Sequence, residues 1–265
     1  MRDQEETSES RRAALIPDEA MRLARIADDQ GVTLRIAGSV GVHLSCPQWR
    51  KYLSAMGRRP LHDIDYWARA KDQRKLEGLL EGQGYRADPR VKHMHEWGVK
   101  RLIFEHPETG IKVDVFMDEL VMAHTIKFLG RLDHDDGPAV PMPDLLLSKL
   151  QIHEITVNDL IDLVVILGEH DLTAGDRPGA DLVYLKAVLG SDWGFWYEAC
   201  RNLVSVREVL GEYRVLGDEE RAVVGRRAEE LRSQIEQCPK TSAWKRRSWL
   251  GPRTRWYELV SEVDR

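Results

Sequence analysis

The alternation of apolar and polar residues divides the chain into two parts of different character. The first part mixes short strand-like stretches with helical spacing. Strands are predicted at residues 32–37, 63–67, 101–105 and 111–116, and helices at residues 16–29 and 72–82. Pro107 and Gly110, in the short connection between the last two strands, predict a hairpin.

The second part begins after Gly137 and three closely spaced prolines, and its pattern is helical. Helices are predicted at residues 144–168, 181–189, 194–213 and 218–236. We therefore expect an α+β fold, with a mixed sheet and flanking helices in residues 16–137. An α-helical bundle domain with a basic-aromatic tail is expected in residues 138–265. Residues 1–15 are predicted to form a disordered N-terminal lead.

Composition argues against several classes of protein. The chain has 265 residues, of which 42% are hydrophobic and 31% charged, and its net charge is -5. The negative charge argues against a surface that binds nucleic acid over its whole extent, although a local basic patch is compatible with it. No apolar run is long enough for a membrane helix, and the polar start does not resemble a signal peptide. Three widely spaced cysteines indicate a reducing compartment, so a cytoplasmic location is expected.

Asp63 and Asp65 are the first candidates for chemistry. Side chains alternate along a strand, so both carboxylates should lie on one face while Ile64 points into the core. Two carboxylates at this spacing repel each other unless a cation lies between them. A divalent metal with hard oxygen ligands fits that requirement.

Two further segments allow both a structural and a functional interpretation. Asp114 lies in the middle of the strand at residues 111–116, where it is either solvated on an edge strand or a third metal-binding or catalytic carboxylate. Gly38 and Ser39 follow a strand and precede a helix. They form either an ordinary tight turn or an anion site at a helix N-terminus.

The C-terminal tail is basic and aromatic, with no acidic residue between Pro239 and Tyr257. Its candidate contact residues are Lys245, Arg246, Arg247, Trp249, Arg253, Arg255 and Trp256. Cations that neutralise phosphates and rings that stack on bases are typical of nucleic-acid surfaces. The alternative is that the tryptophans pin the tail to the helical domain.

The order of these motifs resembles the nucleotidyltransferase superfamily typified by DNA polymerase beta and the aminoglycoside nucleotidyltransferases. The likeness covers about residues 30–170 and is greatest to bacterial AbiE-type toxin nucleotidyltransferases. Those proteins also carry an arginine before the acid pair, matched by Arg59, and a lysine before an Asp-x-x-Asp segment, matched by Lys149. The interval between Ser39 and Asp63 is longer than in compact members and predicts an insertion.

This resemblance implies a nucleotidyltransferase-like fold and transfer of an NMP from an NTP, such as ATP, with release of pyrophosphate. It implies Mg²⁺ (or Mn²⁺) as cofactor. Catalytic and metal-binding roles would fall to Asp63, Asp65 and Asp114, and nucleotide binding to Gly38, Ser39, Arg59 and Lys149. The acceptor is open between an RNA or tRNA end, a small molecule and a protein, and an antitoxin partner is implied. The alternative is a non-catalytic NTP-binding sensor or interaction module.

Overall fold

The computed structural model describes residues 2–89, 101–128, 130–133, 137–175 and 179–259. The chain forms two compact units, and neither is continuous in sequence. Unit 1 consists of Met1–Ser45, Arg59–Leu120 and Lys127–Pro141, and unit 2 of Cys46–Arg58, Val121–Ile126 and Met142–Arg265. Among the described residues there is no helix that could span a membrane.

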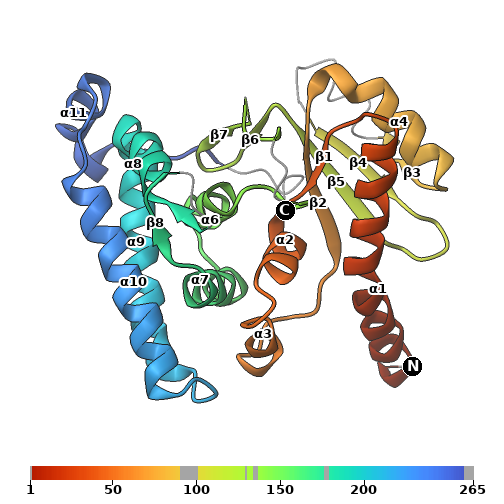
Figure 1. Ribbon diagram of the computed structural model, residues 1–265, viewed down its shortest axis with the longest axis horizontal. Coiled ribbons are helices and arrows are strands. Elements are labelled where there is room, and N and C mark those ends of the chain that lie inside the picture. The colour runs from red at the N-terminus through yellow and green to blue at the C-terminus, as the bar shows by residue number, and fades with distance from the viewer. Residues whose placement is uncertain (1, 90–100, 129, 134–136, 176–178, 260–265) are drawn as a thin grey trace. The chain divides into compact units, whose positions relative to one another are not determined.

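A five-stranded mixed sheet is the centre of unit 1, with the strand order β1-β2-β5-β4-β3 (Figure 1). The strands are β1 (Leu34–Ile36), β2 (Asp63–Ala68), β3 (Arg86–Ala87), β4 (Arg101–Glu105) and β5 (Lys112–Met117). β2 pairs with β5 in parallel, and the other neighbours are antiparallel. The predicted hairpin is confirmed as the β4–β5 pair. Because β5 lies between β2 and β4, the edge-strand interpretation of Asp114 is wrong.

Helices α1 and α4 supply apolar side chains to the core on one side of this sheet. The helical segments of unit 1 are α1 (Arg2–Asp29), α2 (Gly38–Ser45), the short η1 (Ala70–Asp72) and α4 (Gln73–Gly82). On the core side, the hydroxyl of Tyr66 donates a 2.8 Å hydrogen bond to the carbonyl of Ala20 and so ties β2 to α1.

Helix α1 starts well before the predicted position at residue 16 and runs through Pro17. The residues expected to form a disordered lead are therefore helical from Arg2 onward. Glutamate, arginine and alanine, which favour helices, are frequent in this segment, and that preference explains the difference.

The alternation in β2 is as predicted. Ile64 and Tyr66 are fully buried in the core, whereas Asp63 is exposed and Asp65 half-buried on the opposite face. On that face Trp67 stacks on Phe128, with ring centroids 3.9 Å apart and planes 12° apart. The sheet thus has an apolar face, which forms the core, and a second face that carries the acids.

Unit 2 is predominantly helical. Its helical segments are α3 (Lys51–Ala55), α6 (Met142–Leu150), α7 (Val157–Glu169), α8 (Leu182–Ser191), α9 (Trp193–Val209), η2 (Leu210–Glu212), α10 (Asp218–Gln237), α11 (Ser242–Ser248) and η3 (Gly251–Arg253). Two short strands, β8 (Leu172–Thr173) and β9 (Ala180–Asp181), pair in parallel. The strands β6 (Glu119–Val121) and β7 (Thr125–Lys127) form a two-stranded sheet, in which the chain enters unit 2 and returns to unit 1.

The helical stretch predicted at residues 144–168 is divided into two helices, α6 and α7. Thr156 is the N-cap of α7. Its hydroxyl accepts a hydrogen bond from the backbone N–H of Asp159, and the carboxylate of Asp159 accepts one from the backbone N–H of Thr156. This capping box starts a new helix and was not recognised in the sequence. Helix α11, inside the basic tail, was not predicted either.

A buried polar network joins α6, α7 and the segment before β2 inside unit 2. The ammonium of Lys149 lies 3.0 Å from Asp159 Oδ1 and 2.8 Å from Asp162 Oδ2, and Arg58 Nε lies 2.6 Å from Asp162 Oδ1. Burial opposes the charged form of Lys149, but Asp162 and Asp159 outweigh it and raise the pKa of the lysine. Two ion pairs within unit 2 therefore hold Lys149 in its charged form.

We expect Lys149→Met to lower the free energy of unfolding by about 3–5 kcal/mol, because it leaves buried carboxylates short of a cation. Urea denaturation followed by circular dichroism measures the change. The matched control is Lys186→Met, because the Lys186 ammonium contacts the neutral side chain of Gln234. Unchanged stability in Lys149→Met, together with weakened NTP binding, would contradict the structural role and favour the nucleotide-binding role.

Candidate active site

The acids of β2 and β5 meet on one face of the sheet. The parallel register places Asp65 directly opposite Asp114, while Asp63 lies opposite Lys112. One carboxylate oxygen from each of Asp63, Asp65 and Asp114 lies within 4.8 Å of the other two. The structure therefore brings together the three carboxylates that the sequence singled out.

Asp114 has a cationic partner on the neighbouring strand. The Nη2 atom of Arg101, on β4, lies 2.7 Å from Asp114 Oδ2, and the side chains are 8% and 14% exposed. Burial raises the pKa of Asp114, the charge and hydrogen bond of Arg101 lower it, and the charge of Asp63 raises it again. The net pKa lies above the usual value, so an additional cation would favour the ionised carboxylate.

The three acids fit a divalent metal ion. The second oxygen of Asp114, Oδ1, is buried and has no hydrogen-bond partner among the described residues. A buried acceptor of this kind is costly unless something binds it. Carboxylate oxygens are the hard ligands that Mg²⁺ and Mn²⁺ prefer. Asp63, Asp65 and Asp114 could therefore hold such an ion.

Gly38 lies against the acid group. It has a φ of +57°, and a Cβ atom at this position would lie 1.9 Å from Asp65 Oδ2. The backbone N–H of Ala37, one residue earlier, donates a 2.8 Å hydrogen bond to the carbonyl of Asp65. Only glycine combines this backbone conformation with so close an approach, so the start of α2 is fixed beside Asp65.

The other predicted nucleotide-binding residues occupy different surroundings. Ser39 is half-buried in the first turn of α2, and Arg59 is exposed on the segment that leads into β2. Lys149 belongs to unit 2, where Asp159 and Asp162 hold it. The nucleotide-binding roles of these residues stay predictions.

Some side chains of the basic-aromatic tail are held by contacts within unit 2, and others are exposed to solvent. The guanidinium of Arg247 donates to the carbonyls of Gly251 and Thr254 and lies 4.6 Å from the ring centroid of Trp193. The indole of Trp256 donates a 2.8 Å hydrogen bond to Glu198. These two residues pin the tail, as the alternative interpretation proposed. The exposed members are Lys245, Arg246, Trp249, Arg253 and Arg255.

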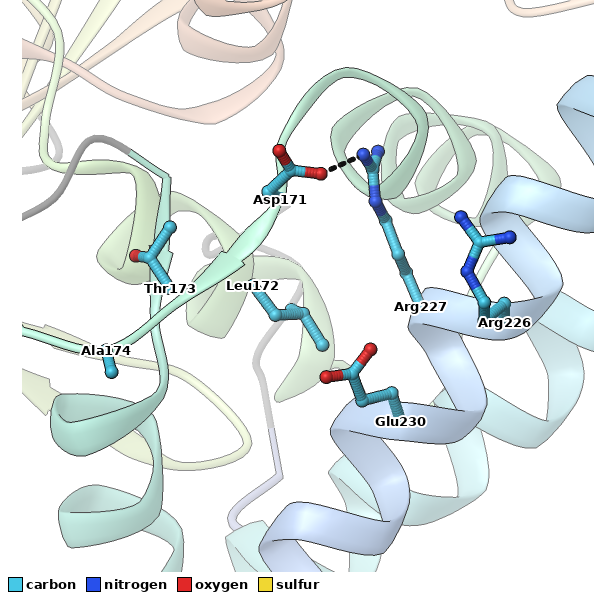
Figure 2. A pocket seen from close by; sticks show the side chains of 7 residues that line it. All are labelled: Asp171, Leu172, Thr173, Ala174, Arg226, Arg227 and Glu230. Carbon is cyan, nitrogen blue, oxygen red and sulfur yellow. Dashed lines mark hydrogen bonds and ion pairs between the residues drawn. The ribbon is translucent and has the colours of Figure 1, made fainter.

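A second polar region of unit 2 surrounds a pocket of about 570 Å³ (Figure 2). Its lining residues are Asp171, Leu172, Thr173, Ala174, Arg226, Arg227 and Glu230. Arg227 binds Asp171 and donates to the carbonyls of Leu167 and Gly168, so it closes the C-terminal end of α7. The pocket is lined by two acidic and two basic side chains, Asp171, Glu230, Arg226 and Arg227, and this mixed charge does not favour one class of ligand.

Arg101 is the residue of this site that sequence reasoning missed. In the β4–β5 hairpin, Arg101 lies opposite Phe116, and Ile103 lies opposite Asp114. The short connection at residues 106–110 already fixes this register. In this register Arg101 and Asp114 lie on the same face of the sheet. Asp114 is the diagonal neighbour of Arg101, two residues along β5 from its direct partner Phe116, and a long side chain can reach it.

Comparison with known proteins gives little beyond this geometry. No protein-family model matches the chain, and no curated protein matches it. Among solved structures, the crystal structure of the lincosamide antibiotic adenylyltransferase LnuA with lincomycin bound is similar, with 20% identity and a TM-score of 0.35. The alignment covers 52% of this chain and 87% of that chain.

We expect Gly38→Ala to destabilise unit 1 more than Gly31→Ala. Both glycines have positive φ, +57° and +65°, but a Cβ at Gly31 meets nothing within 4 Å. Gly31→Ala should cost about 1–2 kcal/mol for the left-handed backbone alone, and Gly38→Ala about 1–3 kcal/mol more for the clash with Asp65. Urea denaturation of both variants measures the difference, and equal costs would contradict the close packing of Gly38 on Asp65.

Proposed function

We propose that the chain is a metal-dependent nucleotidyltransferase that moves an NMP from an NTP to an acceptor and releases pyrophosphate. One observation carries the proposal, namely the placement of Asp63, Asp65 and Asp114 with carboxylate oxygens within 4.8 Å of one another. Such a group is poorly suited to stand alone, because its charges repel and Asp114 is largely buried. Such a group is suited to bind a divalent cation, and the bound cation can in turn bind the phosphates of a nucleotide.

Asp63, Asp65 and Asp114 would hold Mg²⁺ or Mn²⁺. When bound, the metal would offset the negative charge that builds on the phosphates and on the attacking oxygen. Asp114, whose pKa burial raises, would accept the proton of the acceptor hydroxyl or amine. The backbone N–H groups at Gly38 and Ser39 and the hydroxyl of Ser39 would bind the outer phosphates. Arg59 would add positive charge to the triphosphate.

The decisive test is transfer of label from α-³²P-labelled NTPs, with Mg²⁺ or Mn²⁺, to total RNA, small molecules or protein in a cell extract. We expect wild-type protein to label one of these acceptors, and EDTA to abolish the transfer. Asp65→Asn and Asp63→Asn should lose it by at least about a hundredfold, since each removes a charge on which catalysis depends. Their stability should stay equal or rise, because one of three repelling charges is gone.

Asp29→Asn is the matched control, since Asp29 is an exposed acid at the end of α1 in the same unit. It should keep full activity. Full transfer by Asp65→Asn would contradict the assignment of the acids. Binding of NTP with no transfer to any acceptor would favour the alternative, a non-catalytic sensor.

The exposed part of the tail favours RNA as the acceptor. Trp249 is 84% exposed, and the neighbouring Lys245, Arg246 and Arg253 are exposed as well. An exposed indole among cations can stack on a base while the cations bind phosphates.

We expect Trp249→Ala to raise the Kd for a fluorescein-labelled oligouridylate by about fivefold or more, which corresponds to about 1 kcal/mol of lost stacking. Fluorescence anisotropy at fixed salt concentration measures it. Leu250→Ala is the control, because Leu250 is an adjacent apolar side chain, 52% exposed, that cannot stack. Equal affinities of wild type and Trp249→Ala would count against RNA contact at this surface.

A further inference from the structure

Arg101 approaches the acid group from the side opposite to β2. It lies on β4, and β5 with Asp114 separates β4 from β2 with Asp63 and Asp65. Its guanidinium lies 4.9 Å from the ring centroid of Phe116, the residue directly opposite it. A flat guanidinium over an aromatic ring is held in one orientation more firmly than a lysine ammonium would be.

This fixed guanidinium binds one oxygen of Asp114. The contact between Nη2 and Oδ2 is 2.7 Å long and mostly buried, so it is a strong charge-assisted hydrogen bond. The other oxygen, Oδ1, is buried without a hydrogen-bond partner among the described residues. Arg101 therefore sets the rotation of the carboxylate, and one oxygen stays available to a ligand.

We propose that Arg101 is a positioning residue, which holds Oδ2 of Asp114 so that Oδ1 is presented to the divalent cation shared with Asp63 and Asp65. The inference rests on the proposed function, because it concerns the same acids. In this role Arg101 would touch neither nucleotide nor acceptor and would act on the cation through Asp114.

A simpler role for Arg101, to balance the charge of three acids, makes the opposite prediction. Removal of a cation beside the acids increases the negative potential, so charge balance alone predicts tighter binding of a divalent cation. Positioning predicts weaker binding, because the carboxylate of Asp114 is then free to turn. The sign of the change in cation affinity separates the two roles.

Electron paramagnetic resonance of free Mn²⁺, titrated with the full chain, provides this sign without any assay of activity. In Arg101→Met, whose side chain can still cover Phe116, we expect the Kd for Mn²⁺ to rise about tenfold or more, as is typical when a partner that orients a metal ligand is lost. Asp114→Asn, which removes the ligand charge, should weaken Mn²⁺ binding at least as much. Arg101→Lys keeps the charge but not the planar fork, and its Kd should lie between wild type and Arg101→Met.

Kinetics give an independent readout. Under the proposed function, Arg101→Met should lower kcat about tenfold or more and leave KM for the NTP within about twofold, because Asp114 serves the acceptor. Circular dichroism and thermal unfolding check that each variant is folded. If Arg101→Met does not fold, Arg101→Lys decides alone, because positioning predicts a raised Kd and charge balance predicts an unchanged one.

A Kd for Mn²⁺ that is unchanged or lower in Arg101→Met, or in Arg101→Lys where that variant decides, would overturn the positioning role. If wild-type protein also transfers nucleotide, only the inference about Arg101 falls. Wild-type protein that binds no Mn²⁺ and transfers no nucleotide would overturn both this inference and the proposed function.

Discussion

The in-register parallel pairing of β2 with β5 is the constraint on which the site depends. On one face it pairs Ile64 with Val113, and on the other it sets Asp65 directly against Asp114. Like charges that lie opposite each other destabilise a sheet. The buried apolar pairs hold the strands together despite that repulsion, and a single register both builds the core and concentrates the charge.

The sequence predicts the local parts of this arrangement and misses the non-local ones. Period-two alternation is sufficient to put Asp63 and Asp65 on one face, and a short connection is sufficient for the β4–β5 hairpin. The parallel pairing of β2 with β5 joins segments far apart in the chain, and no local pattern encodes it. The ion pairs of Lys149 show the same limit, because its partners Asp159 and Asp162 belong to the next helix and no local pattern predicts the contacts.

The long interval between Gly38 and the acids has a structural explanation. Residues Cys46–Arg58 belong to unit 2, although their neighbours on both sides belong to unit 1. Glu169 accepts the backbone N–H of Trp49 at 2.8 Å, and a Cβ on Gly168 would lie only 2.3 Å from the Trp49 ring. Arg58 binds Asp162 at the other end of the segment. Residues 46–58 are therefore an integral part of the helical unit.

We propose that Asp63, Asp65 and Asp114 form one cation site for nucleotide chemistry. Anomalous diffraction from crystals grown with Mn²⁺ and a non-hydrolysable NTP tests it most directly. We expect anomalous density for one ion beside all three carboxylates, with the triphosphate in contact with that ion. Density elsewhere, or a bound nucleotide whose phosphates lie away from these acids, would contradict it.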